Sequence, residues 1–183
     1  MTSKPTTGEP NLDPIFKSKL QVIKLLALDF DGVLTDGRVY TNEEGIEMVR
    51  SSRRDSMGIG ILEKNGVEVV VISTEANPVV SARCSKIKVP CFQRVDKTEG
   101  KAEILRRVMA EKNLASAQVA YVGDDVNDLA VLKVAGVRLT VADGHPKVQA
   151  VCDYVATRKG GDHAVREICD LILEAQGKEI AWH

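Results

Sequence analysis

Residues 23–37 read IKLLALDFDGVLTDG. The stretch begins with a short apolar run, turns polar at Asp29 and continues with Asp31 and a glycine. Uninterrupted apolar runs of this length are typical of strands buried on both faces of a parallel sheet. In such sheets, ligands bind at the edge where the carboxyl ends of the strands lie. The stretch therefore predicts a buried strand that places two carboxylates at a binding edge.

The rest of the chain alternates similar runs with helical patterns. Further strands are predicted at residues 67–72, 119–122, 137–141 and 154–156, after the first at 23–28. Apolar residues at helical spacing and glycine-containing ends predict helices over residues 57–64, 101–112, 126–135 and 164–175. This alternation predicts an α/β fold with a Rossmann-like, doubly wound parallel sheet.

One segment departs from the alternation. Residues 38–41 and 46–49 flank a turn with a glycine and predict a β-hairpin, at about residues 37–49, above the carboxyl edge of the sheet. The alternative is a plain surface loop. Residues 1–20 begin with a polar, proline-containing segment and are predicted to be a flexible leader, which leaves residues 21–183 as a single domain.

Composition narrows the classes of function. The 183 residues carry 25 Lys and Arg against 26 Asp and Glu, a net charge of -1. This balance offers no basic footprint for nucleic acid or an anionic membrane, and no apolar run approaches the roughly 20 residues that span a bilayer. The four cysteines show no metal-ligand spacing, and we expect reduced thiols in a cytoplasmic protein.

Acidic residues gather where the first and third predicted strands end. One such aspartate alone is most simply a helix N-cap. Five carboxylates at two strand ends would raise one another's pKa values and require a cation among them. Oxygen ligands without His or Cys favour Mg²⁺ over zinc. The candidate metal ligands are Asp29, Asp31, Asp124, Asp125 and Asp128.

A phosphoryl group suits such a site. Mg²⁺ and the ammonium of Lys101 would neutralise a phosphate dianion and let a carboxylate approach phosphorus. Ser73, after the second strand, can donate a hydrogen bond to a phosphoryl oxygen. The chain contains neither G-x-x-x-x-G-K-[ST] nor G-x-G-x-x-G, so no nucleotide triphosphate or dinucleotide is indicated. A carboxylate nucleophile would form an aspartyl-phosphate that water then cleaves.

Four short motifs carry a resemblance to a known family. Residues 29–37, DFDGVLTDG, resemble the first motif of the haloacid dehalogenase superfamily of phosphatases. Ser73 in VISTE resembles the second motif, Lys101 the third, and residues 123–128, GDDVND, the fourth. Each motif is weak alone, but all four stand in the order of the family.

The resemblance implies catalytic roles. Asp29 would be the nucleophile. Asp31 would protonate the leaving alkoxide and then activate water for dephosphorylation. Ser73 and Lys101 would hold the phosphoryl oxygens.

It also implies the metal ligands. Asp29 and Asp124 would bind Mg²⁺ directly, and Asp31 would bind it through its main-chain carbonyl. Asp125 and Asp128 would act through water molecules or by supporting the direct ligands.

The likeness extends to a branch of this superfamily without a cap domain. Residues 31–73 have room for the hairpin and one helix, and residues 73–101 for a helix and a short strand. The capless branch acts on phosphorylated sugar acids and includes octulosonate-8-phosphate and acylneuraminate-9-phosphate phosphatases, as well as domains fused to acylneuraminate cytidylyltransferases. The resemblance implies a homotetramer whose hairpins meet centrally and whose subunits complete one another's pockets. It also implies a pathway association with an acylneuraminate cytidylyltransferase.

Two departures bear on the substrate. After the hydroxyl residue of the second motif the octulosonate enzymes carry Gly-Arg, whereas this chain has Thr74-Glu75, which looks more like the nine-carbon, sialic-acid-type branch. Where the octulosonate enzymes carry Asn-Val-Arg-Asp, residues 52–55 of this chain read SRRD. Arg83 suits the carboxylate of a sugar acid. Alternatively, Arg83 is a solvated helix residue and Arg54 pairs with Asp55. The candidate substrate-binding residues are Ser73, Thr74, Glu75, Arg83, Lys101, Arg54 and Asn127.

Other residues have less specific roles. His145, just before a proline, is expected to open a helix, and the alternative is that it orients the site. His163 and Arg166 are candidates for the border of a neighbouring pocket.

The main hypothesis is a Mg²⁺-dependent phosphomonoesterase that removes the terminal phosphate of a nonulosonate or octulosonate. One alternative is a phosphatase of broad specificity on sugar phosphates. Another is a non-catalytic module that tetramerises a nucleotidyltransferase, although both aspartates of the first motif are present. A receiver domain also clusters acids and a lysine on such a sheet, but the Asp-x-Asp pair and the hairpin argue against it.

Overall fold

The apolar runs form strands because their alternate residues face two separate cores. In β1 (Leu25–Leu28), Leu26 and Leu28 face one core and Leu25 and Ala27 face the other, and all four side chains are fully buried. A strand with helices on both faces has no side that can be polar. These features come from a computed structural model, which describes residues 12–96 and 99–181.

In the described part of the chain, six parallel strands form the main sheet, and the predicted α/β, doubly wound architecture is confirmed. Its central strand, β1, pairs in parallel with β4 on one side and with β6 on the other. The carboxyl ends of these three strands therefore lie side by side at one edge of the sheet. The order across the sheet is β5 (Cys91–Phe92), β4 (Glu68–Ile72), β1, β6 (Val119–Val122), β7 (Val137–Thr140) and β8 (Tyr154–Val155).

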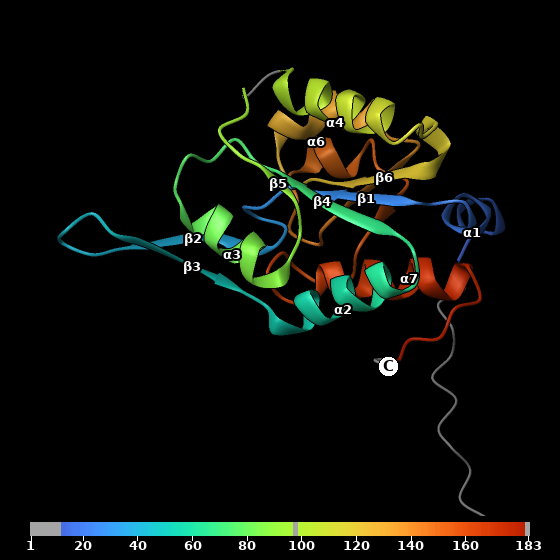
Figure 1. Ribbon diagram of the computed structural model, residues 1–183, viewed down its shortest axis with the longest axis horizontal. Coiled ribbons are helices and arrows are strands. Elements are labelled where there is room, and N and C mark those ends of the chain that lie inside the picture. Colours follow the sequence, from blue (N-terminus) through green and yellow to red (C-terminus); the bar gives the residue numbers. More distant parts are fainter. Residues whose placement is uncertain (1–11, 97–98, 182–183) are drawn as a thin grey trace, which may run out of the picture.

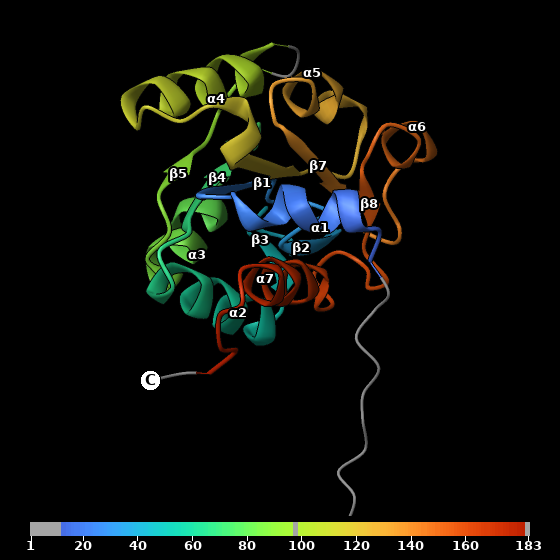
Figure 2. The same ribbon diagram turned by 90° about the vertical axis from the view of Figure 1, so that its right-hand side faces the viewer.

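Helices cover both faces of the sheet (Figures 1 and 2). One face is covered by α4 (Gly100–Glu111), α5 (Leu129–Leu132) and α6 (Pro146–Gln149). The other core includes side chains of α1 (Pro14–Gln21), α2 (Arg53–Lys64), α3 (Val79–Ile87) and α7 (Ala164–Ala175). Within the described ranges, no helix is long and apolar enough to cross a membrane.

Two predicted helices differ in length from the observed ones. Helix α2 begins four residues before the predicted 57–64, because the Ser52 hydroxyl accepts hydrogen bonds from the N–H groups of Arg54 and Asp55 and so caps an earlier start. The predicted helix 126–135 is instead a 3₁₀ turn followed by the four-residue α5. The predicted helix 164–175 coincides with α7.

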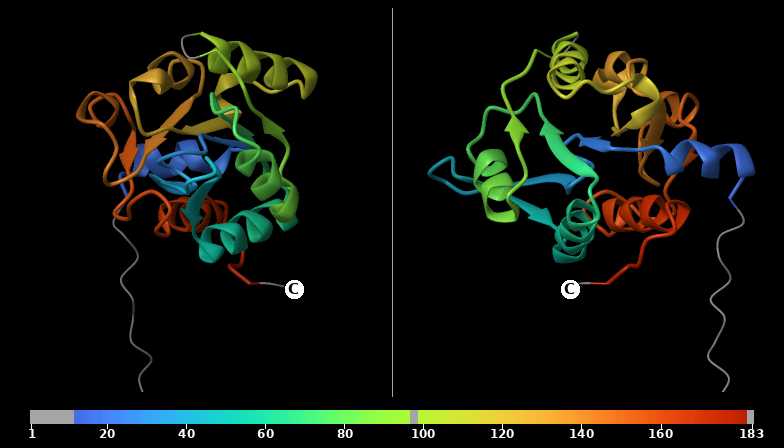
Figure 3. Two further views of the ribbon diagram at one scale, coloured as in Figure 1. Left: turned by 90° about the vertical axis from the view of Figure 1, so that its left-hand side faces the viewer. Right: turned by 45° about the vertical axis from the view of Figure 1, so that its right-hand side comes forward.

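The predicted hairpin is confirmed. Strands β2 (Thr35–Thr41) and β3 (Glu47–Ser51) pair antiparallel and project from the carboxyl edge of the sheet, as the right-hand view of Figure 3 shows. At the tip, the Asn42 side chain accepts hydrogen bonds from the N–H groups of Glu44 and Ile46. The described elements between the first and third motifs are the hairpin, α2, β4, α3 and β5, none of which forms a cap domain.

The flexible leader predicted over residues 1–20 is wrong for residues 14–20. These residues belong to α1, where Asp13 caps the first turn and Phe16 and Leu20 are buried in the core. The proline content suggested an unstructured segment, but Pro14 stands at the start of the helix, where its missing N–H costs no hydrogen bond. Residues 1–11 lie outside the described residues.

Replacement of Leu20 by alanine tests whether α1 belongs to the domain. Leu20 is 1% exposed, and its truncation should lower the free energy of unfolding by about 3 kcal/mol. The control is Ile15→Ala on the same helix, because Ile15 is 70% exposed and should change stability by less than about 0.5 kcal/mol. Urea unfolding measures both variants, and equal stabilities would contradict a structural role for α1.

Candidate active site

The candidate site lies at the carboxyl edge, where β1, β4 and β6 end side by side. A pocket of about 390 Å³ opens there. Seven of the predicted site residues line it together with two glycines and a valine. The lining residues are Asp29, Asp31, Gly32, Gly37, Ser73, Thr74, Asp124, Asp125, Val126 and Asn127.

The floor of the site is a buried lysine between two carboxylates. Lys101 Nζ lies 2.6 Å from Asp29 Oδ2 and 2.7 Å from Asp128 Oδ1, and the lysine side chain is 1% exposed. Burial alone would lower the pKa of Lys101, but the charges of Asp29 and Asp128 outweigh it and raise that pKa. The lysine therefore stays charged and fixes the position of Asp29.

Asp128 is held from several directions. Its Oδ1 also accepts a hydrogen bond from the Tyr121 hydroxyl at 2.8 Å, and its Oδ2 accepts from the N–H groups of Asp124 at 3.0 Å and Asp125 at 3.4 Å. Burial raises the pKa of Tyr121 well above its ordinary value, so the phenol remains a neutral donor. Asp128 thus fixes both Lys101 and the loop that carries Asp124.

Three carboxylates come close enough to share a cation. Oxygen atoms of Asp29, Asp124 and Asp128 lie within 4.8 Å of one another. Burial and the charge of Asp128 raise the pKa of Asp124 to about 7. The same causes raise the pKa of Asp29 well above its ordinary value, against the opposing effect of Lys101. The fourth-motif residue Asp125 is outside this cluster, and its carboxylate accepts a hydrogen bond from the Val126 N–H.

Asp31 faces the pocket from the loop after β1. Its Oδ1 accepts a hydrogen bond from the Thr35 hydroxyl at 3.3 Å, and burial, followed by the charge of Glu75, raises its pKa. The next residue, Gly32, has φ +75°, and a Cβ there would lie 1.9 Å from Asp124 Oδ2. Only glycine lets the first and fourth motifs approach this closely.

The second motif forms a tight loop after β4. The Glu75 N–H donates to Ser73 Oγ at 3.1 Å, which leaves the Ser73 hydroxyl proton free for another acceptor. The Glu75 carboxylate accepts hydrogen bonds from the N–H groups of Ala76 and Asn77 and does not line the pocket, whereas Thr74 does. The Asn77 side chain donates to Glu47 of β3 at 2.9 Å, which joins this loop to the hairpin.

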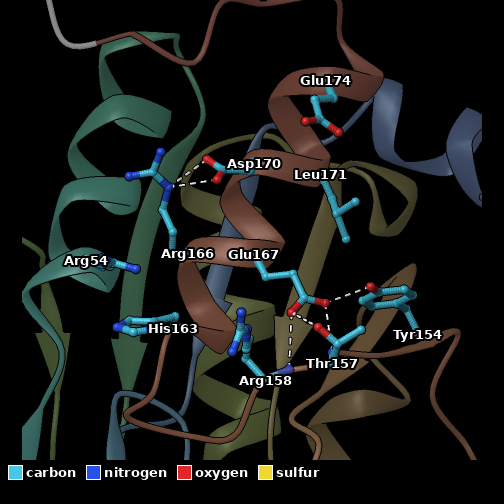
Figure 4. A pocket seen from close by; sticks show the side chains of 10 residues that line it. All are labelled: Arg54, Tyr154, Thr157, Arg158, His163, Arg166, Glu167, Asp170, Leu171 and Glu174. Carbon is cyan, nitrogen blue, oxygen red and sulfur yellow. Dashed lines mark hydrogen bonds and ion pairs between the residues drawn. The ribbon is translucent and has the colours of Figure 1, made fainter. Parts of the chain in front are cut away.

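Two predicted substrate-binding arginines lie outside the pocket. The Arg83 guanidinium donates to the Ser52 carbonyl at 3.3 Å and to Ser56 Oγ at 2.5 Å. Arg54 borders a different hollow, beside α7 (Figure 4). The alternatives also fail, because Asp55 accepts a hydrogen bond from the Arg166 N–H rather than pairing with Arg54, and Arg83 is not merely solvated.

The expected helix-opening role of His145 is confirmed. The His145 ring accepts a hydrogen bond from the Lys147 N–H at the start of α6. The main-chain N–H of His145 donates to the Asp124 carbonyl at 2.7 Å. His163 and Arg166 both line the hollow beside α7.

Sequence reasoning missed Tyr121, Thr35 and Asn77. Tyr121 stands inside an apolar run and is indistinguishable there from a core aromatic residue. Thr35 begins a strand and Asn77 stands in a loop, and only their partners in space reveal their roles.

Comparison with known proteins agrees with this arrangement. The family of haloacid dehalogenase-like hydrolases matches residues 73–168. A 3-deoxy-D-manno-octulosonate 8-phosphate phosphatase of Salmonella typhimurium is 37% identical over 91% of this chain and 88% of its own length. The corresponding enzyme of Escherichia coli K12 is 37% identical over 88% of this chain and 85% of its own.

Solved structures point the same way. A 3-deoxy-D-manno-octulosonate 8-phosphate phosphatase from Yersinia pestis is similar with a TM-score of 0.86 and 33% identity, covering 90% of this chain and 88% of that one. Another from Moraxella catarrhalis, solved with a magnesium ion, a phosphate ion and KDO, has a TM-score of 0.84 and 32% identity, covering 89% and 92%. The chain therefore belongs to the haloacid dehalogenase-like hydrolases and is a phosphoric monoester hydrolase.

Proposed function

We propose that the protein is a Mg²⁺-dependent phosphatase that removes the terminal phosphate of a phosphorylated 2-keto-3-deoxy sugar acid through an aspartyl-phosphate. The substrate class is octulosonate-8-phosphate or a nonulosonate-9-phosphate. The observation that carries the proposal is the fixed Asp29 carboxylate, held by Lys101 at 2.6 Å and exposed on its other side to a pocket that Asp31 and Ser73 also line.

Each residue has a place in the reaction. The Asp29 carboxylate attacks phosphorus, and the bond to the sugar oxygen breaks as the bond to Asp29 forms. Asp31 gives its proton to the leaving alkoxide, a task that its raised pKa supports, and then takes a proton from the water that attacks the aspartyl-phosphate. The Ser73 hydroxyl and the Lys101 ammonium hold phosphoryl oxygens.

The carboxylate cluster fits a divalent cation. Asp29 and Asp124 would bind Mg²⁺ directly, with the Asp31 main-chain carbonyl, while Asp128 orients the loop of Asp124. Burial, followed by the charge of Asp128, raises the pKa of Asp124, and a bound cation would offset both effects. Related phosphatase structures hold magnesium or cobalt. Mg²⁺ would supply positive charge that lets a phosphate dianion enter an acidic pocket.

A second subunit would supply what the pocket lacks. Arg83 lines a separate hollow with three further cationic residues, Arg53, Lys86 and Lys88, and this basic surface suits the carboxylate of a substrate bound in a neighbour. The hairpin residues Val39, Ile46 and Met48 are 51%, 56% and 59% exposed in the single chain, and such an apolar patch marks an interface. We therefore propose a homotetramer in which hairpins pack together and neighbours complete each site.

The proposal also covers the length of the sugar acid, the partner enzyme and the cellular compartment. The relatives support the eight-carbon acid, whereas Thr74-Glu75 supports a nine-carbon acid of the sialic-acid type, which would associate the enzyme with an acylneuraminate cytidylyltransferase. All four cysteines are free, which suits the cytoplasm. Comparing kcat/KM on octulosonate-8-phosphate and on nonulosonate-9-phosphates decides between the two acids.

One alternative also has support. Among the described residues, no arginine lines the catalytic pocket, so the single chain offers no guanidinium there for a substrate carboxylate. That observation favours a broad phosphatase on small sugar phosphates. Equal kcat/KM on sugar-acid phosphates and on neutral sugar phosphates would establish it.

Asp29→Asn tests the covalent route. The change keeps the shape of the side chain but removes the anionic nucleophile, so kcat should fall by about 10³-fold or more. Steady-state kinetics with a sugar-acid phosphate measures the loss, and thermal unfolding checks that the variant is folded. A folded variant with near wild-type kcat would exclude Asp29 as the nucleophile.

Paired substitutions at the fourth motif test the metal site. Asp124→Ala should raise the Mg²⁺ concentration for half-maximal activity by about 100-fold, whereas Asp125→Ala, outside the cluster, should raise it by about 10-fold or less. Chelation with EDTA should abolish the activity of the wild type, and Mg²⁺ should restore it. Full activity in EDTA, or the reverse order of the two variants, would contradict the assignment.

Charged substitutions in the hairpin test the assembly. Ile46→Glu with Met48→Glu should dissociate the oligomer and raise KM for a sugar-acid phosphate about tenfold or more, with little change for p-nitrophenyl phosphate, which needs no neighbouring subunit. Val22→Glu is the control, because Val22 is 48% exposed but lies far from the hairpin, beside α1 (Figure 1). Light scattering and kinetics measure both, and a monomer with unchanged KM would refute the shared site.

A further inference from the structure

A second hollow of about 390 Å³ lies beside α7 and shares no lining residue with the catalytic pocket. It is bordered by the first turn of α2, by β8 and the segment after it, and by one side of α7 along most of its length (Figure 4). Its volume falls in the range of small-molecule sites, roughly 300–1,000 Å³. The proposed reaction uses none of the residues that line it.

Most acidic groups of this hollow are already satisfied. The Glu167 carboxylate accepts hydrogen bonds from the Tyr154 hydroxyl at 2.7 Å, from the Thr157 hydroxyl and N–H at 2.7 and 2.8 Å, and from the Arg158 N–H at 3.2 Å. Asp170 accepts from Arg166 Nε at 2.8 Å with both oxygens. The carboxylates of Glu167 and Asp170 therefore have their charge balanced or their lone pairs occupied.

The two arginine side chains at the other end of the hollow are not satisfied in this way. Within the described residues, the Arg54 and Arg158 guanidinium groups have no hydrogen-bond or ion-pair partner, and His163 Nδ1 is 3.8 Å from Asp162. Arg54 comes from α2, and Arg158 and His163 come from the segment between β8 and α7. The three side chains gather near the N-terminal end of α7, as Figure 4 shows. The helix terminus adds partial positive charge at the same place.

The backbone that carries two of these groups is held in place. The Gly160 N–H donates to Asp143 at 3.0 Å, and the Gly161 N–H donates to the Val33 carbonyl at 3.0 Å. A Cβ at Gly160 would lie 1.8 Å from the Gly32 carbonyl oxygen, so the segment is pressed against the first-motif loop. His163 adopts φ +78°, a conformation that residues other than glycine rarely adopt. Arg158 and His163 therefore start from a fixed backbone.

We propose that this hollow is a binding site for a small oxyanion, a phosphate or carboxylate group, held by Arg54, Arg158 and His163. Guanidinium groups pair with the two oxygens of such groups through parallel hydrogen bonds. The acidic residues further along α7 would repel a second negative group. We therefore expect ligands that carry their negative charge only at the end held by the two arginines.

Binding in the presence of EDTA excludes the catalytic pocket. Without a metal ion, the carboxylates of the catalytic pocket repel anions, so an anion that still binds must bind elsewhere. Inorganic phosphate, followed by ³¹P line broadening, and acetate, followed by calorimetry, are the two probes. Saturable binding of one or both is expected, and the tighter probe identifies the kind of group.

Substitutions locate the bound anion. Arg54→Ala and Arg158→Ala should each weaken binding by about tenfold or more, the value of one hydrogen bond to a charged group. Lys159→Ala is the matched control, because Lys159 is exposed in the same segment but does not line the hollow. Both arginines are exposed, so the variants should fold, and thermal unfolding checks this. Absence of saturable binding of either probe, or binding unchanged in both arginine variants, overturns the proposal.

Discussion

The buried ammonium of Lys101 is the group on which the site depends. A charge taken out of water is costly unless it is paired and hydrogen-bonded. Here it is paired with Asp29, from the end of β1, and with Asp128, from the turn after β6, while the lysine itself belongs to α4. The carboxylates in turn need the lysine, because each is almost fully buried. Three elements distant in sequence are thereby held together by one charge.

Much of the fold could be predicted because its signals are local. The strand β1 is an apolar run whose alternate residues face two cores, and the asparagine and glycine after α2 mark its end. Helix α1 could not be predicted in this way. Its stability comes from contacts distant in sequence, such as the stacking of Phe16 on Tyr154 at 5.3 Å and the pairing of Lys19 with Asp153.

The same distinction divides the site residues. Asp29, Ser73 and Asp124 could be predicted because each follows a strand, and adjacent parallel strands end together. The sequence contains no comparable signal for the direction of a long side chain. The side chains of Arg54 on α2 and Arg83 on α3 line two separate hollows and not the catalytic pocket. The packing of the two helices determines the direction of these side chains.

The hydrogen bond between Asn77 and Glu47 connects two traits that are usually separate. Glu47 belongs to the projecting hairpin, and Asn77 closes the loop that begins at Ser73 and supports Thr74 at the pocket. A mutation that shifts the hairpin would therefore also shift the loop that carries Ser73 and Thr74 at the pocket. In the proposed tetramer, this one hydrogen bond would connect the packing of subunits with the shape of the pocket, so that evolutionary change in either one would also affect the other.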